Sequence, residues 1–134
     1  MDDTKKLMLI HEQETHAVIG AAMAVHRHFG CGFTEKVYQD ALEVEFQHLQ
    51  IPYLREHAIY ANYRGKKLST EFKPDFLCYD KVIVELKAVK ELEDLHRAQA
   101  INYAHVAGYD VALLINFGQP SLQFERFTTR RKSP

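Results

Sequence analysis

Cysteine is scarce in this chain of 134 residues, which contains only Cys31 and Cys78. Two cysteines do not make a disulfide framework, and the apolar surroundings of Cys78 indicate a small buried side chain. The net charge of −1 gives no global electrostatic reason to bind nucleic acid, although it is compatible with a local basic patch. The longest apolar segment, 17–25, is too short to span a bilayer, and no secretory signal is visible. We therefore expect a cytoplasmic protein that does not insert into membranes.

Length and composition predict a single globular domain over residues 1–134. Apolar residues make up 46% of the chain and charged residues 26%, which is usual for a soluble domain with a hydrophobic core. No internal repeat or low-complexity linker divides the sequence. Residues 1–9 and 128–134 are expected to be loose tails.

The spacing of apolar residues predicts three helices and six strands. Two helices come first, ending near Gly30 and before Pro52. A hairpin, a pair of strands, a third helix and two strands follow. The expected ranges are helices at about 12–29, 34–49 and 92–107, and strands at about 53–63, 67–72, 73–78, 82–89, 111–117 and 122–127. The order α-α-β-β-β-β-α-β-β predicts an α/β sandwich whose mixed sheet is flanked by helices, with strand 111–117 parallel to strand 82–89.

One strand that reads as buried carries two charged residues. The segment 82–89 is apolar enough for the centre of a sheet, yet it contains Glu85 and Lys87, which share one face because they are two residues apart. Burying such groups is costly unless they are paired or bind a metal. Asp75, on the preceding strand, joins that face only if the loop between the strands has an odd number of residues or the strand has a bulge. A three-residue loop at 79–81 places Asp75 opposite Glu85.

This arrangement favours metal-dependent chemistry on phosphates. Two close carboxylates repel each other, so one pKa should rise, and a divalent cation would remove the repulsion. Mg²⁺ and Mn²⁺ prefer such oxygen ligands and can activate a water molecule for attack on a phosphoryl group. Lys87 is placed to orient that water or to neutralise the developing charge. The alternative is a structural ion network of Asp75, Glu85 and Lys87, and residue types alone leave both open.

Two polar residues on the predicted helices are further candidates. Gln99 interrupts an apolar stripe on the helix 92–107, and a buried amide needs partners, which a site beside Glu85 and Lys87 would supply. A glutamine at the edge of the stripe that reaches solvent is the other reading. Glu35 lies in the first turn of the helix 34–49, where the helix dipole alone favours a carboxylate.

Four motifs stand in order along residues 12–127: Gly32-Phe-Thr-Glu35-Lys-Val-Tyr38, then Pro74-Asp75 followed by Glu85-Leu86-Lys87, then Gln99-x-x-x-Tyr103, and finally Leu114-Ile-Asn-Phe-Gly118. With them the chain resembles the PD-(D/E)xK nuclease superfamily. Within that superfamily it looks like the GxxExxY proteins, a group of small prokaryotic proteins. The glutamine–tyrosine spacing is similar to the helix motif of the branch that includes the RecB nuclease domain.

The resemblance implies a restriction-endonuclease-like fold and a Mg²⁺- or Mn²⁺-dependent nuclease that cuts phosphodiester bonds, with DNA favoured over RNA as the substrate. It also implies roles for individual residues. Asp75 and Glu85 would be metal ligands, with the Leu86 carbonyl as a third oxygen and Glu35 completing the site. Lys87 would be the catalytic lysine, assisted by Gln99. Tyr103 and Tyr38 would be supporting residues.

Other functions remain open at this point. A nuclease-like module that binds nucleic acid or a protein partner without cutting is the main alternative, and the near-neutral charge favours it. A homodimer formed through an exposed edge strand is also compatible with the sequence. A basic rim for a phosphate backbone is conceivable, although each residue in it is individually typical of an ordinary surface. Its members would be Lys66, Lys67, Lys87, Lys90, Arg97 and the tail 130–132.

A zinc site at His26, His28 and Cys31 is disfavoured. Residues two apart on a helix point to different faces, and only three candidate ligands are present.

Overall fold

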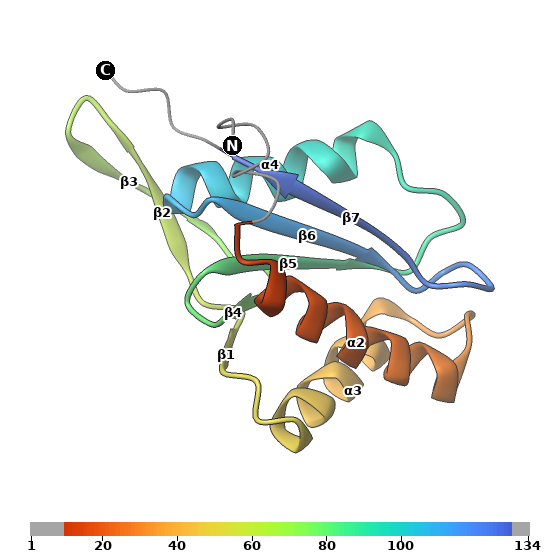
Figure 1. The fold of residues 1–134 in the computed structure, drawn as a ribbon. Coiled ribbons are helices and arrows are strands. Elements are labelled where there is room, and N and C mark those ends of the chain that lie inside the picture. The colour runs from red at the N-terminus through yellow and green to blue at the C-terminus, as the bar shows by residue number, and fades with distance from the viewer. Residues whose placement is uncertain (1–9, 130–134) are drawn as a thin grey trace, which may run out of the picture.

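The structure is a computed structural model that describes residues 10–129. Within this range there are three helices and seven strands (Figure 1). The elements are α2 (Glu12–Phe29), α3 (Glu35–His48), β1 (Tyr53–Arg55), β2 (Ile59–Tyr63), β3 (Lys66–Phe72), β4 (Phe76–Cys78), β5 (Val82–Lys87), α4 (Asp94–Ala107), β6 (Val111–Asn116) and β7 (Gln123–Thr128). The loose tails expected at 1–9 and 130–134 fall outside the described residues. Thr128, also expected in a tail, instead ends β7.

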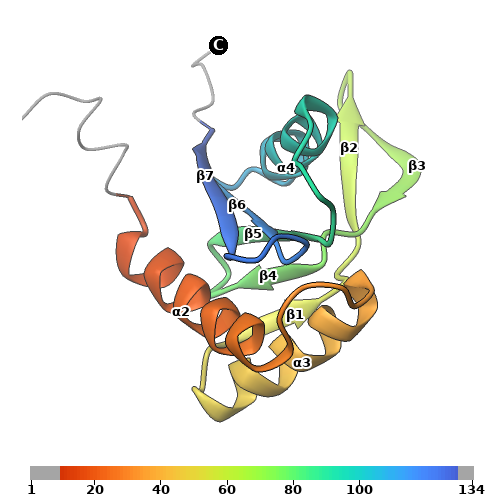
Figure 2. The same cartoon turned by 90° about the vertical axis from the view of Figure 1, so that its right-hand side faces the viewer.

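The main sheet has five strands in the order β1-β4-β5-β6-β7. β5 and β6 are parallel and the other neighbours are antiparallel. Helices α2 and α3 cover one face, and α4 covers the other (Figures 1 and 2). The predicted α/β sandwich with a mixed, helix-flanked sheet is therefore confirmed, as is the parallel pairing across the α4 crossover.

Alternation along the central strands produces two hydrophobic cores. Val82, Val84 and Leu86 of β5 pack toward α2 and α3, whereas Ile83 packs toward α4. This period of two is the expected geometry of a strand buried on both faces. Glu85 and Lys87 follow Ile83 on the α4 side of β5.

The segment 53–63 differs from the prediction of one continuous strand. Glu56 has a positive φ of 52°, which interrupts the extended backbone. The part before it, β1, joins the main sheet beside β4, and the Tyr53 ring packs 5.6 Å from those of Phe46 and Phe76. Only the later part, β2, forms the predicted hairpin with β3. Five strands rather than four therefore precede α4.

Helix α4 uses small residues against the sheet. Its buried residues are Ala100 and Ala104, which allow the helix backbone to approach β5 and β6 closely. The stripe expected to face the core does so only in part: Leu92 is buried and Tyr103 packs against the core, but Leu95 is 76% exposed. The larger side chains of α4 lie instead beside the β2–β3 hairpin, which projects from the main sheet next to α4 (Figure 2).

The two cysteines lie in different environments. Cys78 is fully buried in β4, as predicted, and burial raises the pKa of its thiol. Cys31 is exposed. Of the helices between residues 10 and 129, none combines the length and apolarity needed to cross a membrane.

Candidate active site

The loop between β4 and β5 determines which way Asp75 points. Cys78 pairs with Val82, so the loop has three residues, 79–81, as predicted. Lys81 N donates to the Cys78 carbonyl at 3.0 Å, and the first two loop residues have positive φ values of 58° and 54°. Continuing the register of β4 and β5 places Asp75 opposite Glu85, with no bulge required.

Two hydrogen bonds tie Asp75 and Glu85 together. The Asp75 backbone N–H donates to Glu85 Oε1 at 2.9 Å, and the Leu86 N–H donates to Asp75 Oδ2 at 2.7 Å. Each carboxylate thus has one oxygen fixed by the backbone of the opposite strand. The second oxygen of each accepts no hydrogen bond from residues 10–129. Glu85 is only 4% exposed and Asp75 is half-buried, so the pair is a preorganised acidic site with limited access to water.

The carboxyl groups of this site bind protons more tightly than usual. Burial, and then the charge of Asp75, raise the pKa of Glu85 to about 8, although the Asp75 N–H and Lys87 oppose the rise. Burial also raises the pKa of Asp75, opposed by the Leu86 N–H and by Lys87. Such raised values are found where carboxylates share a site of low polarity.

Helix α3 brings Glu35 to the same place. Thr34 is the N-cap, so Glu35 stands in the first turn, as predicted. Burial, and then the charge of Asp75, raise the pKa of Glu35, while Lys87 lowers it. These effects require all three side chains to lie within electrostatic reach of one another.

Tyr38, one turn after Glu35, is fully buried. Its hydroxyl donates to the Gly30 carbonyl and accepts from the Phe33 N–H. Its ring stacks on Phe117, with centroids 4.5 Å apart. Tyr38 therefore fixes the connection that leads into α3 and does not face the acidic pair directly.

Lys87 and Gln99 share a cleft beside α4. The half-buried Lys87 lies two residues after Glu85 on the same face of β5, and it lines a cleft of about 470 Å³ together with Gln99 and Tyr103. Gln99 is half-buried rather than fully buried, and its Nε2 donates to the Tyr103 hydroxyl at 3.1 Å. The Leu86 side chain points to the opposite core, and only its backbone belongs to the site.

No closed metal cage is preformed. In the part of the chain from 10 to 129, no three or more His, Cys, Asp or Glu side chains are arranged as a metal-binding group. Glu35, Asp75 and Glu85 interact electrostatically, but their oxygens are not already grouped as a metal cage. The acidic pair itself offers two oxygens without protein donors.

The remaining sequence candidates lie elsewhere. His26 is buried and its Nε2 hydrogen-bonds the Gln119 carbonyl at 2.8 Å, whereas His28 and Cys31 are exposed. Arg97, expected in a basic rim, is instead paired with Glu125 and Asp94.

Two members of the expected rim, Lys66 and Lys67, are exposed at the start of β3, and Lys67 Nζ lies 3.9 Å from the centroid of the Tyr60 ring. Lys90 is also exposed, and 130–132 are outside the described residues.

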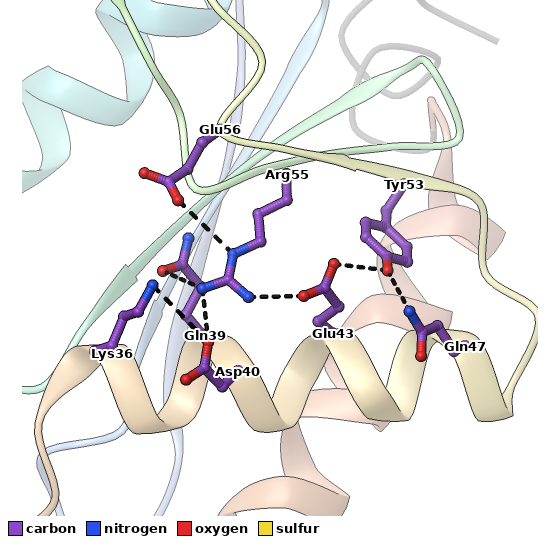
Figure 3. Close-up of polar contacts among 8 residues, drawn as sticks. All are labelled: Lys36, Gln39, Asp40, Glu43, Gln47, Tyr53, Arg55 and Glu56. Atoms are coloured by element: carbon purple, nitrogen blue, oxygen red, sulfur yellow. Dashed lines mark hydrogen bonds and ion pairs between the residues drawn. The ribbon is translucent and has the colours of Figure 1, made fainter.

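Sequence reasoning missed an arginine network that joins β1 to α3 (Figure 3). Arg55 donates to Glu43 and Asp40 at 2.7 Å each and to Gln39 Oε1 at 3.1 Å. The amide nitrogen of Gln39 is buried without a partner among the described residues. All three acceptors lie on the helix that carries Glu35, so this network fixes α3 against the sheet edge. The sequence gives no signal for it until β1 is known to lie beside α3.

A second missed feature holds the strand end after Lys87. Asn116 pairs with Lys87 in the parallel register. The Asn116 side-chain oxygen accepts a hydrogen bond from the Val89 N–H at 2.9 Å, and the Asn116 amide nitrogen donates one to the Val89 carbonyl at 2.9 Å. A Cβ at Gly118 would lie 2.2 Å from the same carbonyl oxygen, so this position requires glycine. The end of β6 therefore holds the backbone that follows Lys87 in place through hydrogen bonds to Val89.

An aspartate tied to the glutamate of a Glu-x-Lys strand, at the centre of a mixed sheet with helices on both faces, is the arrangement of a nuclease-like α/β fold. The chain belongs to the PD-(D/E)XK nuclease superfamily, whose family model matches residues 12–127. Placement in the GxxExxY group within it stays a prediction.

Among solved structures, the chain is similar to one titled "Crystal structure of SSO0001", with a TM-score of 0.55 and 15% sequence identity. The match covers 73% of this chain and 52% of that one. The chain therefore spans about half the length of that relative, and the likeness shows the fold alone. A search of the curated proteins found no significant match.

Proposed function

We propose that this protein is a divalent-metal-dependent nuclease that hydrolyses phosphodiester bonds, with DNA as the expected substrate. The observation that carries the proposal is the cross-tied pair of Asp75 and Glu85, with Lys87 on the same strand face. Membership of a nuclease superfamily supports it.

The donor set fits Mg²⁺ or Mn²⁺. Asp75 and Glu85 each have one oxygen held by a backbone N–H, which leaves the other for a cation. The raised pKa of Glu85, about 8, reflects an uncompensated buried charge of the kind that a cation relieves. Mg²⁺ keeps several waters and needs only one or two protein carboxylates, so the absence of a closed cage among residues 10–129 is no obstacle. Glu35 and the Leu86 carbonyl are the proposed additional ligands.

When bound, the cation would activate a water and neutralise charge on the phosphate. The chain's own residues have complementary roles in the proposal. The Lys87 ammonium orients the attacking water and stabilises charge on the phosphoryl oxygens. Gln99, held by the Tyr103 hydroxyl, contacts the water or the substrate from the other side of the cleft. Glu35, within reach of both Asp75 and Lys87, completes the acidic environment.

A second candidate is a module that binds nucleic acid without cutting it. The observation that favours it is that no three-ligand metal arrangement is present between residues 10 and 129. This candidate predicts binding that weakens with salt, because phosphate contacts release counterions. It also predicts that binding needs no metal.

The deciding experiment incubates end-labelled single-stranded, duplex and branched DNA with the protein and Mn²⁺. EDTA and the Lys87→Ala variant should each abolish cleavage. Lys81→Ala is the matched control, because Lys81 is an exposed loop lysine that pairs with Glu14 at 3.7 Å; cleavage should persist in it. Cleavage that survives Asp75→Ala, Glu85→Ala and Lys87→Ala alike would refute the nuclease proposal. Salt-sensitive binding without cleavage would support the second candidate.

A further inference from the structure

The cleft beside Lys87 has an apolar wall that the proposed chemistry does not use. It has a volume of about 470 Å³ and lies between α4 and the end of β3. Phe72, Leu95 and Val106 contribute apolar side chains, while Lys87, Gln99 and Asn102 contribute polar groups. Pockets of this size, with apolar walls and a few polar groups, are typical of small-ligand sites.

Phe72, Leu95 and Val106 belong to neither of the two hydrophobic cores. Helix α4 packs on the sheet through Ala100 and Ala104, and its larger side chains are turned toward the cleft. Leu95 is 76% exposed. An exposed leucine in a concave surface, beside two aromatic residues, indicates a binding site, whereas a single exposed apolar residue elsewhere does not.

Two aromatic rings give the cleft a defined shape. Phe72, the last residue of β3, meets Tyr103 of α4 edge to face, with ring centroids 5.8 Å apart and planes at 62°. Tyr103 is held in turn by Gln99 Nε2. A flat ligand can therefore stack on one ring while its edge meets the other ring and the amides of Gln99 and Asn102.

We propose that this cleft binds one unpaired nucleobase of the substrate, next to the phosphate that the acidic pair acts on. This inference rests on the proposed nuclease function and specifies its substrate class. A nucleobase has an aromatic face and a hydrogen-bonding edge, which match the rings and amides of the cleft. Lys87 belongs to both the cleft and the acidic site, so a base in the cleft brings its own phosphate to the carboxylates.

The consequence is a preference for single-stranded or locally unpaired DNA. A base that is stacked and paired inside a duplex cannot enter the cleft without being extruded, which costs a few kcal/mol. A strand end, gap, flap or bulge presents an unpaired base without this cost.

Binding to an abasic probe tests the cleft separately from cleavage. The two probes are a fluorescein-labelled DNA hairpin with a short single-stranded tail, and the same hairpin with an abasic tail. Their backbone charges are identical, so only the bases differ. Anisotropy is measured in EDTA, where a metal-dependent nuclease does not cut. Base–aromatic stacking contributes about 1–3 kcal/mol per base, so the tail with bases should bind roughly 5- to 150-fold more tightly.

Phe72→Ala should bring that ratio close to one. Leu95→Glu, at an exposed position where folding is not at risk, should lower it as well. Phe124→Ala is the matched control, because Phe124 is an exposed aromatic residue of β7 that does not line the cleft; it should keep the wild-type ratio. Circular dichroism of each variant verifies the fold.

Three results would overturn the inference. The first is equal binding of both probes by the wild-type protein. The second is a ratio unchanged in both Phe72→Ala and Leu95→Glu. The third is a dimer that Leu95→Glu converts to a monomer in light scattering, which would assign the cleft to a second copy of the chain. Because the probes are read without metal, absence of nuclease activity leaves the test valid. Equal binding of the two probes by a protein that still cleaves DNA with Mn²⁺ would remove only this inference and leave the proposed function standing.

Discussion

Because the Glu85 carboxyl is buried, we predict that the free energy of unfolding depends strongly on pH. The pKa of Glu85 is about 8 in the folded chain, against an ordinary value of 4.5 that applies to the unfolded chain. The folded protein therefore holds a proton that the unfolded chain releases between these two values. The stabilisation is complete below pH 4.5 and is lost as the pH rises through about 8. Asp75, whose pKa is also raised, shares this behaviour, so the titration belongs to the pair.

The magnitude follows from linkage. Each pH unit in that interval should lower the free energy of unfolding by about 1.4 kcal/mol, so a change from about pH 5.5 to about pH 7.5 should remove about 3 kcal/mol. Urea denaturation at several pH values in EDTA measures this directly. Most domains have their maximum stability between about pH 5 and pH 8, so a steep fall within that range distinguishes this site.

Two variants assign the effect to Glu85. Glu85→Gln keeps an oxygen to accept the Asp75 N–H but cannot ionise, so the fall in stability should largely disappear. Glu43→Gln is the matched control: Tyr53 and Arg55 hold the pKa of Glu43 below its usual range, so that residue is ionised in both states at these pH values. The Glu43→Gln substitution should therefore leave the fall in the free energy of unfolding with rising pH unchanged. A wild-type protein whose stability is flat or rises between about pH 5.5 and pH 7.5 would refute the reasoning.

The other predictions concern the residues that support the site. Gly118→Ala should lower the free energy of unfolding by about 2 kcal/mol or more, because the new methyl group would meet the Val89 backbone. Gly20→Ala, at a helical position with nothing within 4 Å, should instead raise it by about 0.5–1 kcal/mol; urea denaturation that ranks them in the opposite order would contradict the account. Tyr38→Phe should cost about 1 kcal/mol through the lost bond to the Gly30 carbonyl, and an unchanged denaturation midpoint would argue against that bond. Arg55→Met should raise the Glu43 pKa toward its ordinary value, and Tyr53→Phe should raise it by more than Arg55→Met does, because the Tyr53 hydroxyl is the larger cause of the lowered pKa. NMR titration of the Glu43 carboxyl group measures both changes. An unchanged Glu43 pKa in both variants would show that the network does not form in solution.

Much of the central fold follows from local rules. The apolar runs of β5 and β6 and the crossover through α4 were enough to predict their parallel pairing. Because strand faces alternate with a period of two, Asp75 could share the face of Glu85 only through an odd-length loop or a bulge, and the three-residue loop of the structure confirms this expectation. These parts depend on the chain order and on periodicity, both of which are visible in the sequence.

Other parts depend on tertiary contacts that no local pattern encodes. The break at Glu56 arises because β1 belongs to the main sheet and β2 to the hairpin. The stripe through Leu95 has helical spacing, yet the fully buried residues of α4 are Ala100 and Ala104, so spacing alone did not identify the part of the helix that packs on the sheet. Arg55 becomes informative only when β1 is known to lie beside the acidic side chains of α3. The sequence therefore did not reveal which distant residues and strands come into contact in the folded chain.

The most direct test of the central claim is a calorimetric titration of Mn²⁺ into the wild-type protein and the Asp75→Asn, Glu85→Gln and Glu43→Gln variants. The account predicts one class of Mn²⁺ site in the wild-type protein and in Glu43→Gln, and its loss in the two variants of the acidic pair. Equal Mn²⁺ binding by Glu85→Gln and the wild-type protein would contradict the claim that Asp75 and Glu85 form the metal site.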